Sequence, residues 1–228
     1  YNDESKAHGL LKVDIGTHIN GYVADTAFSI DLENSEENKN LIKAAEIARD
    51  KALETIKNGI SLRAVGKIIE ITCESLKTQP IRNLSGHSIE KHNIHAGLTI
   101  PNFDNNQETK IEEGVYAIEP FTTLLSGTGA VKDGKLSGIY HLEKEGNVRD
   151  NFSRRVLKFI TEEYQTLPFC ARWIHKKFST RGLLALRQIE SAGLLHHYPQ
   201  LIEKSGTKVA QAEHTVVLTD NEKIVTTR

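Results

Sequence analysis

The chain has 228 residues, 38% hydrophobic and 26% charged, and its 29 Lys and Arg residues nearly balance its 30 Asp and Glu residues. This composition predicts one globular domain of generous size, or one domain with a sub-domain, and excludes a disordered or fibrous chain. A net charge of -1 argues against non-specific nucleic-acid binding by the chain as a whole. No apolar stretch approaches the roughly 20 residues that span a bilayer, which excludes membrane insertion.

The cysteines and the start of the chain bear on its compartment and completeness. Cys73 and Cys170 match no disulfide or metal-ligand pattern, and no signal peptide is readable, so we expect a reducing, cytoplasmic location. The chain begins at Tyr1 and contains no methionine. We therefore expect a fragment cut at its N-terminus, or a sequence from which modified methionines were omitted.

The apolar patterns predict a mixed α+β fold. Two β-rich runs over residues 10–31 flank Asn20-Gly21, a strong signal for a two-residue hairpin turn. Helical spacing then predicts one helix that opens at Ser35 and ends by Gly59, and another that opens at Ser61. Further strands are expected at 114–121, 208–218 and 224–227, and further helices around 152–160 and 183–189.

Residues 151–206 differ from the rest of the chain in charge. They hold nine Lys or Arg residues and four Asp or Glu residues, a net charge of +5, which leaves -6 for the remainder. This pattern predicts a basic helical insert. Such basic helices are most often a solvated face, although a docking role is an alternative.

The predicted hairpin brings two aspartates together. A two-residue loop pairs Ile19 with Tyr22, so that Asp14 faces Ala27 and Asp25 faces Gly16. Both aspartates then project from one face as diagonal neighbours, roughly 7–8 Å apart at Cα. We expect the other face of the hairpin to pack as an apolar layer, which would place the aspartates within buried strands. The residues of this apolar face are Val13, Ile15, Thr17, Ile19, Tyr22, Ala24, Thr26, Phe28 and Ile30. A cation between the carboxylates would relieve their repulsion, whereas two solvated acids are the commoner arrangement.

Other polar residues in unusual settings favour the metal interpretation. His87 and His95 lie in glycine-flanked, apolar-bordered segments, and Glu119 and Glu213 lie within strand patterns. Two Asp, one or two His and two Glu form a ligand set for Co, Mn, Fe or Zn, and four carboxylates are enough to bridge two ions. Two such metals activate water and polarise a carbonyl, which is hydrolase chemistry. For each histidine alone, an ordinary core or surface role is the commoner one.

Several motifs resemble those of archaeal-type type 2 methionine aminopeptidases, a family with the pita-bread metallopeptidase fold. In the family's order, and over essentially the whole length, they are VDIGTHINGYVADTAFSID, NLSGHSIEKHNIHAGLTIPN, YAIEPF, LPFCARW and VAQAEHTVVL. The resemblance implies an α+β, creatinase/aminopeptidase-like fold with a helical insert sub-domain. Residues 1–150 and 207–228 would form the catalytic domain, and 151–206 the insert that is typical of type 2 enzymes.

The resemblance also implies the residues of the site. The family's ligands for two divalent metal ions fall on Asp14, Asp25, His87, Glu119 and Glu213. Its catalytic roles fall on His95, which would stabilise the tetrahedral intermediate, and on Glu119, which would transfer the proton of the attacking water. Substrate-binding positions fall on His95, Ile94, Phe121 and Tyr198, the last three lining an apolar methionine pocket, and His141 matches a pocket position only loosely.

The implied function is removal of the initiator methionine from nascent proteins. The expected partners are nascent polypeptide N-termini, with ribosome association left open, and we expect a monomer without a specific nucleic acid or a membrane as partner. The alternatives are a proline-directed metallopeptidase of the same fold, or a non-catalytic pita-bread binding protein. The His-Ala-Gly motif and the insert favour the methionine enzyme, and the presence of all five ligand types disfavours a non-catalytic protein.

One feature departs from the family pattern. The family carries a further catalytic histidine upstream of the first ligand aspartate, in a segment that has no match in this sequence. His8 is not a substitute, because it stands in a polar stretch that does not resemble the upstream motif.

Overall fold

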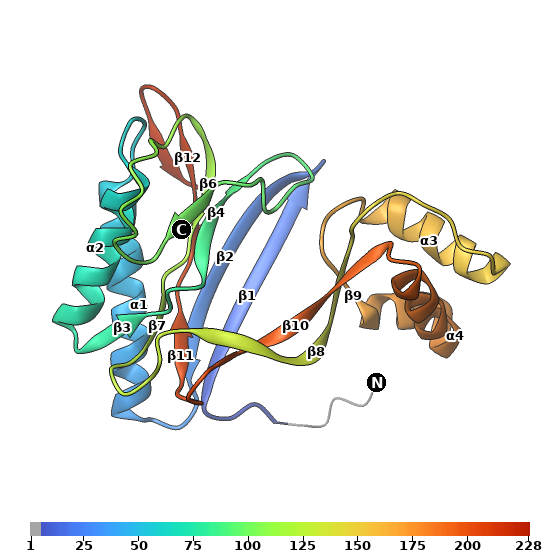
Figure 1. The fold of residues 1–228 in the computed structure, drawn as a ribbon, viewed down its shortest axis with the longest axis horizontal. Helices are drawn as coiled ribbons and strands as arrows, with labels where there is room; N and C mark the ends of the chain where they lie inside the picture. Colours follow the sequence, from blue (N-terminus) through green and yellow to red (C-terminus); the bar gives the residue numbers. More distant parts are fainter. Residues whose placement is uncertain (1–5) are drawn as a thin grey trace. The chain divides into compact units, whose positions relative to one another are not determined.

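The computed structural model describes residues 6–228, which divide into two compact units. The larger unit contains residues 6–132 and 202–228, and the smaller unit contains Asp133–Leu201. Figure 1 traces the helices and strands of each unit. Both helices and strands are present, which confirms the predicted α+β class. Within residues 6–228, no helix has both the length and the apolar character that crossing a membrane requires.

Two helices of the larger unit begin at the predicted residues. They are α1 (Glu36–Thr55) and α2 (Leu62–Ser75). The side-chain oxygens of Ser35 and Ser61 accept hydrogen bonds from backbone N–H groups in the first turns, which satisfies donors that the helices leave unpaired. The two helices pack against each other beside the strands (Figure 1). Their buried faces form much of one core cluster, which includes Ala48, Leu53, Leu62, Val65 and Ile69.

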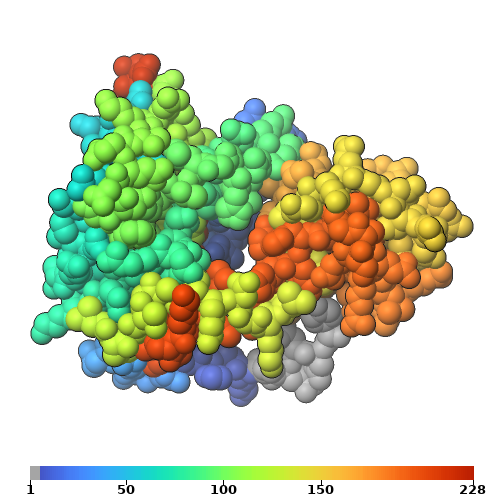
Figure 2. Space-filling model, in the orientation of Figure 1, coloured from blue at the N-terminus to red at the C-terminus, as the bar shows by residue number. Residues whose placement is uncertain are grey.

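The larger unit contains two sheets besides the hairpin. One has the order β11 (Val209–Gln211), β7 (Phe121–Leu124), β3 (Thr78–Pro80). The other has the order β13 (Lys223–Val225), β12 (His214–Leu218), β6 (Gly114–Ile118), β4 (Ser85–Ile89), β5 (Thr99–Pro101). Figure 2, in the same orientation, shows that α2 and the segments from β3 through β7 form much of this face of the larger unit.

Two predicted strands are interrupted in the structure. The strand expected at 114–121 is divided into β6 and β7 by Glu119-Pro120, and the strand expected at 208–218 is divided into β11 and β12 by Ala212-Glu213. Because β6 pairs with β12 and β7 pairs with β11, the two interruptions lie side by side, and the Ala212 N–H donates to the Pro120 carbonyl over 3.3 Å. Each interruption therefore places one acidic residue at the junction of the two sheets.

The hairpin has the predicted register. β1 (Leu10–Ile19) and β2 (Tyr22–Asp31) pair Asp14 with Ala27 and Asp25 with Gly16. Both residues of the loop have positive φ, 52° at Asn20 and 87° at Gly21, as a two-residue turn of this kind requires.

The prediction of which hairpin face is packed was wrong. Asp25 and Ala27 are buried, whereas the apolar face is largely exposed, with Ile15 44% and Tyr22 68% exposed. The reason is that one edge of β2 lies along residues 211–215, which covers Asp25 and Ala27. The Gln211 N–H donates to Ser29 Oγ over 2.9 Å, and the Glu213 N–H donates to the Ala27 carbonyl over 2.8 Å. Period-two alternation distinguishes the two faces of a hairpin but does not say which one is covered.

The smaller unit holds two helices and a small sheet. Its helices are α3 (Asn151–Glu163) and α4 (Ala171–Ser191). Its strands have the order β10 (Leu195–Glu203), β8 (Val131–Leu142), β9 (Phe169–Cys170), and the first two residues of β8 and the last two of β10 belong to the larger unit. The helix expected near 183–189 begins earlier than predicted, at Ala171, and continues across a kink at Ser179, where φ is 56°. Apolar residues from both helices form its core. The assignment of 151–206 as a type 2 insert stays a prediction.

Candidate metal centre

The five predicted ligands all lie in the larger unit. Asp14 and Asp25 come from the two strands of the hairpin, and His87 lies in β4. Glu119 and Glu213 occupy the two strand interruptions. Asp25, His87, Glu119 and Glu213 are buried, whereas Asp14 is exposed.

Three of these side chains form a compact group. Asp25, His87 and Glu213 each offer one ligand atom, and the three atoms lie within 4.8 Å of one another. His87 Nε2 lies 3.9 Å from Asp25 Oδ2 and 3.4 Å from Glu119 Oε1. This spacing suits one imidazole and several carboxylates around a divalent ion.

A side chain outside the predicted set connects the remaining two carboxylates. The amide nitrogen of Gln211 donates to Asp14 Oδ2 over 3.0 Å and to Glu119 Oε2 over 3.3 Å. Sequence reasoning missed Gln211. The available signal was its position two residues before Glu213, because residues two apart in a strand project toward the same side.

The electrostatics of the cluster favour the binding of a cation or of protons. Burial, with the Asp14 charge as a smaller cause, raises the pKa of Asp25 to about 7. Burial and then the charges of Asp14 and Asp25 raise the pKa of Glu119 well above its ordinary value. Burial and then the charge of Glu119 raise the pKa of Glu213 to about 11. These carboxyl groups cannot all be ionised at neutral pH unless a cation compensates them.

Two further features fit a cation. Burial, followed by the influence of His95, lowers the pKa of His87 to about 4, which keeps the imidazole neutral and able to act as a ligand. Glu213 Oε1 is buried and has no hydrogen-bond partner among the described residues. An orphaned carboxylate oxygen is costly in a protein interior, and a metal ion would satisfy it. The donor set of carboxylates with one imidazole therefore fits divalent metals.

Two of the predicted substrate-binding residues lie beside this cluster. The His95 ring packs edge-on against the His87 ring, with centroids 4.4 Å apart, and His95 is exposed. Ile94 approaches the hairpin, since a β-carbon added to Gly16 would lie 3.9 Å from Ile94 Cδ1 and 3.8 Å from Asp25 Oδ1. Both residues are therefore close to the carboxylates.

Phe121 begins β7 and is paired in register with Gln211. It thus lies two residues after Glu119, on the strand next to the one that carries Gln211. Its proposed contact with a substrate side chain stays a prediction.

Tyr198 and His141 belong to the smaller unit. Their rings pack together with centroids 5.2 Å apart, and the Tyr198 ring also contacts the His196 ring at 4.6 Å. His141 Nε2 lies 3.0 Å from Glu143 Oε2. The proposed roles of Tyr198 and His141 in a substrate pocket stay predictions.

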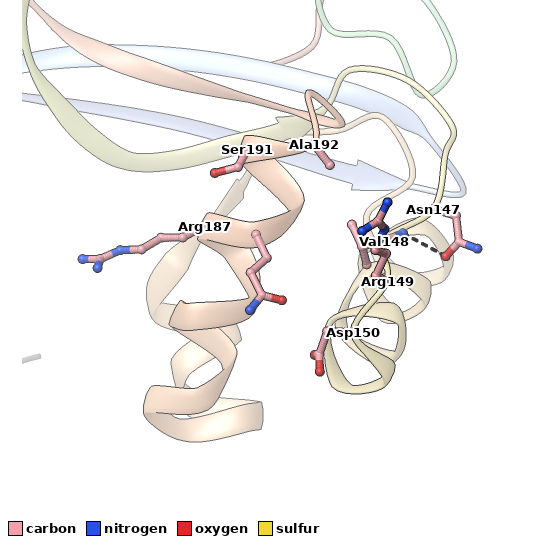
Figure 3. Close-up of a pocket in the computed structure, with 8 residues that line it drawn as sticks. Asn147, Val148, Arg149, Asp150, Arg187, Ser191 and Ala192 are labelled. Atoms are coloured by element: carbon pink, nitrogen blue, oxygen red, sulfur yellow. Dashed lines mark hydrogen bonds between the residues drawn. The ribbon is translucent and has the colours of Figure 1, made fainter.

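The smaller unit also contains a hollow of about 640 Å³, between the start of α3 and the end of α4. Figure 3 shows its lining, in which Arg149 and Arg187 extend in different directions. Asp150 is used to cap α3 and accepts a hydrogen bond from the Ser153 N–H over 2.7 Å. None of the predicted ligands lines this hollow, and its two cations do not converge on a common point.

The pKa shifts predict how the metal-free protein responds to pH. Asp25, Glu119 and Glu213 have raised pKa values in the folded state, so between about pH 4 and 7 the folded state holds protons that the unfolded state has lost. His87 and His214, whose pKa values are lowered from 6.5 to about 4, and His141, whose pKa is also lowered, act in the opposite direction below about pH 6.5. Above that pH the contribution of the carboxyl groups remains, so we expect the free energy of unfolding to fall as the pH rises from about 6.5 to 8.

Thermal unfolding of protein treated with chelator, measured across this pH range, tests the expectation. Addition of Mn²⁺ should remove most of the decline, because the cation compensates the ionised carboxylates. If the free energy of unfolding does not change with pH in the absence of metal, the pKa values of these carboxyl groups are not raised in the folded state.

Comparison with known proteins supports a metallopeptidase. A family model described as "Metallopeptidase family M24" matches residues 1–220. The chain therefore belongs to metallopeptidase family M24. It is also 40% identical over 228 residues to the methionine aminopeptidase of Methanocaldococcus jannaschii, a match that covers 100% of this chain and 76% of that protein. This relationship places the chain in the family of archaeal methionine aminopeptidases, which confirms the predicted resemblance.

Solved structures show the same fold. A thermophilic Arx1 matches with a TM-score of 0.78 at 16% identity, over 95% of this chain and 66% of that one. The methionine aminopeptidase of Thermotoga maritima matches with a TM-score of 0.61 at 21% identity, over 96% of this chain and 64% of that one. The chain thus spans less than two thirds of each solved chain. At these identities the likeness concerns the fold alone, and it confirms the pita-bread prediction.

Proposed function

We propose that the protein is a metalloaminopeptidase that removes the initiator methionine from nascent polypeptides. The observation that carries the proposal is the buried group of Asp25, His87 and Glu213, whose ligand atoms lie within 4.8 Å of one another beside two further carboxylates. The proposed substrate is inferred from the relationship to archaeal methionine aminopeptidases.

The proposed centre holds two divalent ions. Asp14, Asp25, His87, Glu119 and Glu213 would bind them, and the four carboxylates supply the negative charge that two such ions require. When bound, divalent ions of this kind lower the pKa of water and act as Lewis acids toward a carbonyl oxygen. We propose Co, Mn, Fe or Zn as the metal.

Two side chains would move or hold the reacting groups. Glu119 accepts the proton of the attacking water and passes it to the leaving amine, a role that needs a carboxylate at the cluster; Glu119 Oε1 lies there, 3.4 Å from His87 Nε2. His95 is exposed next to His87 and donates a hydrogen bond to the oxygen that develops negative charge.

The substrate would be positioned by apolar contacts. Ile94 and Phe121 are the residues of the larger unit proposed to line the methionine pocket, since an unbranched thioether side chain gains most of its binding energy from burial. Ile94 lies near Asp25, which supports a pocket that adjoins the ligand cluster.

The proposed partners are the N-termini of nascent chains. We further propose that the protein acts in the cytoplasm as a monomer, close to ribosomes.

A comparison of two substrates tests the proposed specificity. With Mn²⁺ or Co²⁺ present, the protein should cleave Met-Ala-Ser and leave intact an Xaa-Pro dipeptide whose first residue is not methionine, because the proposed pocket binds the side chain of the residue before the scissile bond, and that dipeptide offers no methionine there. Released amino acids are measured for both peptides under the same conditions.

Two other outcomes are informative. Preferential cleavage of the Xaa-Pro dipeptide would establish the alternative of a proline-directed peptidase. Metal binding without cleavage of either peptide would favour the alternative of a non-catalytic binding protein.

A further inference from the structure

We propose that Gln211 is a positioning residue of the metal centre, which sets the separation of the two carboxylates that lie outside the compact group. This inference rests on the ligand set proposed above. In this role Gln211 orients Asp14 and Glu119, which would bind the metals, and it does not itself contact the reacting atoms.

The geometry of the amide carries the inference. One nitrogen, Gln211 Nε2, lies 3.0 Å from Asp14 Oδ2 and 3.3 Å from Glu119 Oε2, so it bonds one oxygen of each carboxylate. The second oxygen of each group then remains for other partners, and Glu119 Oε1 is the oxygen that faces His87 Nε2 at 3.4 Å. Gln211 therefore orients both carboxylates without occupying the oxygen directed at the cluster.

The environment of Gln211 makes this orientation rigid. Gln211 is only 3% exposed and lies at the end of β11, opposite Phe121. Its backbone N–H is held by Ser29 Oγ at 2.9 Å. A buried amide on a fixed strand loses little conformational entropy when it holds its partners, which is the property expected of a residue that supports metal ligands.

The side chain is not needed to connect the strands at this point. The connection between β11 and the hairpin uses the Gln211 backbone, through Ser29 Oγ, and the pairing of β11 with β7 is a backbone ladder. The chemistry of the amide is also specific, because an amide is a neutral donor that can satisfy two carboxylates without competing with a cation for charge. Glutamate at this position would place a third negative charge next to Asp14 and Glu119.

Titration of the metal-free protein with Mn²⁺ by calorimetry tests the inference, since this readout does not depend on activity. Gln211→Met keeps the length of the side chain and removes the donor. We expect its Mn²⁺ affinity to be about 10–100-fold weaker than that of the wild type, the usual effect of losing a group that orients metal ligands.

Gln79→Met is the matched control. The Gln79 amide donates to the carbonyl oxygens of Leu124, Leu125 and Gly127, at 2.9, 3.3 and 3.0 Å, and contacts none of the proposed ligands. Gln79→Met should lower the unfolding temperature and leave the Mn²⁺ affinity unchanged. Gln211→Asn retains the amide but shortens its reach, and it should also weaken Mn²⁺ binding. If Gln211→Met does not fold, the Mn²⁺ affinity of Gln211→Asn tests the role of Gln211.

The results separate this inference from the proposed function. Wild-type Mn²⁺ affinity in a folded Gln211→Met or Gln211→Asn variant overturns the role of Gln211 and leaves the metal centre intact. A wild-type protein that binds no Mn²⁺ overturns the ligand set itself, and the inference with it.

Discussion

Replacing Glu119 by Gln, or Asp25 by Asn, is expected to abolish turnover of Met-Ala-Ser. Each change removes one carboxylate from the proposed centre, and Glu119→Gln also removes the group that accepts the proton of the attacking water. General acid–base catalysis alone typically contributes 10²–10⁴-fold, so we expect kcat to fall by on the order of 10³-fold or more. The measurement is the initial rate of methionine release at saturating Mn²⁺.

The same variants should not lose stability when metal is absent. Burial and neighbouring negative charges raise the pKa values of both carboxyl groups, so a neutral amide relieves repulsion in the folded state. The metal-free variants should unfold at the temperature of the wild type or above it. Loss of activity with an intact fold assigns the effect to chemistry.

Two matched controls use the same substitutions elsewhere in the larger unit. Glu203→Gln alters a buried carboxylate that accepts hydrogen bonds from the Thr128 and Ser205 N–H groups, and Asp104→Asn alters the ion-pair partner of Arg63. Hydrogen bonds to Ser205 and Thr128 keep the pKa of Glu203 at about 2 in spite of burial, so its replacement should cost stability. Both controls should retain turnover per folded molecule. Substantial activity in Glu119→Gln or Asp25→Asn would refute the assignment.

Replacing His95 by Ala is expected to lower kcat by on the order of 10²–10³-fold, the usual effect of losing one donor to a developing oxyanion. His95 is exposed and its ring contacts the His87 ring, so a substrate at the cluster can reach it. His95 is not one of the proposed metal ligands. Mn²⁺ affinity should therefore stay near that of the wild type. Steady-state kinetics and calorimetry on the same preparation measure the two effects.

His8→Ala is the control for this experiment. His8 is exposed and lies before β1 in the polar stretch that precedes Asp14. Its replacement should leave both kcat and Mn²⁺ affinity unchanged. A His95→Ala variant with wild-type kcat, or a His8→Ala variant with a large loss, would reverse the roles assigned to these two histidines.

Local signals in the sequence predicted much of the scaffold around the site. Asn20-Gly21 predicted the hairpin turn and its register, because a two-residue loop leaves one pairing available to the strands. Ser35 and Ser61 predicted the starts of α1 and α2, because each hydroxyl caps the turn that follows it. These features depend on contacts between residues that are close in the chain.

The strand interruptions at Glu119 and Glu213 could not both be predicted in this way. Pro120 is a local signal for a break after Glu119, but no such residue stands beside Glu213, and only the pairing of β6 with β12 and of β7 with β11 reveals the junction between sheets. The position of Gln211 two residues before Glu213 was a local signal, but its two carboxylate partners are 197 and 92 residues away in the chain, and only the packed structure reveals them.

The sequence by itself determined the identities of the acids and histidines, the hairpin register and the helix starts, because turn and capping preferences act over a few residues. Only the tertiary structure decided that Asp25, His87 and Glu213 lie within 4.8 Å of one another, that Gln211 joins Asp14 to Glu119, and that Asp25 and Ala27 are buried while the apolar face of the hairpin is largely exposed. These outcomes depend on contacts between strands far apart in the chain. Such contacts are selected by the free energy of the whole packed unit, and no local pattern encodes them.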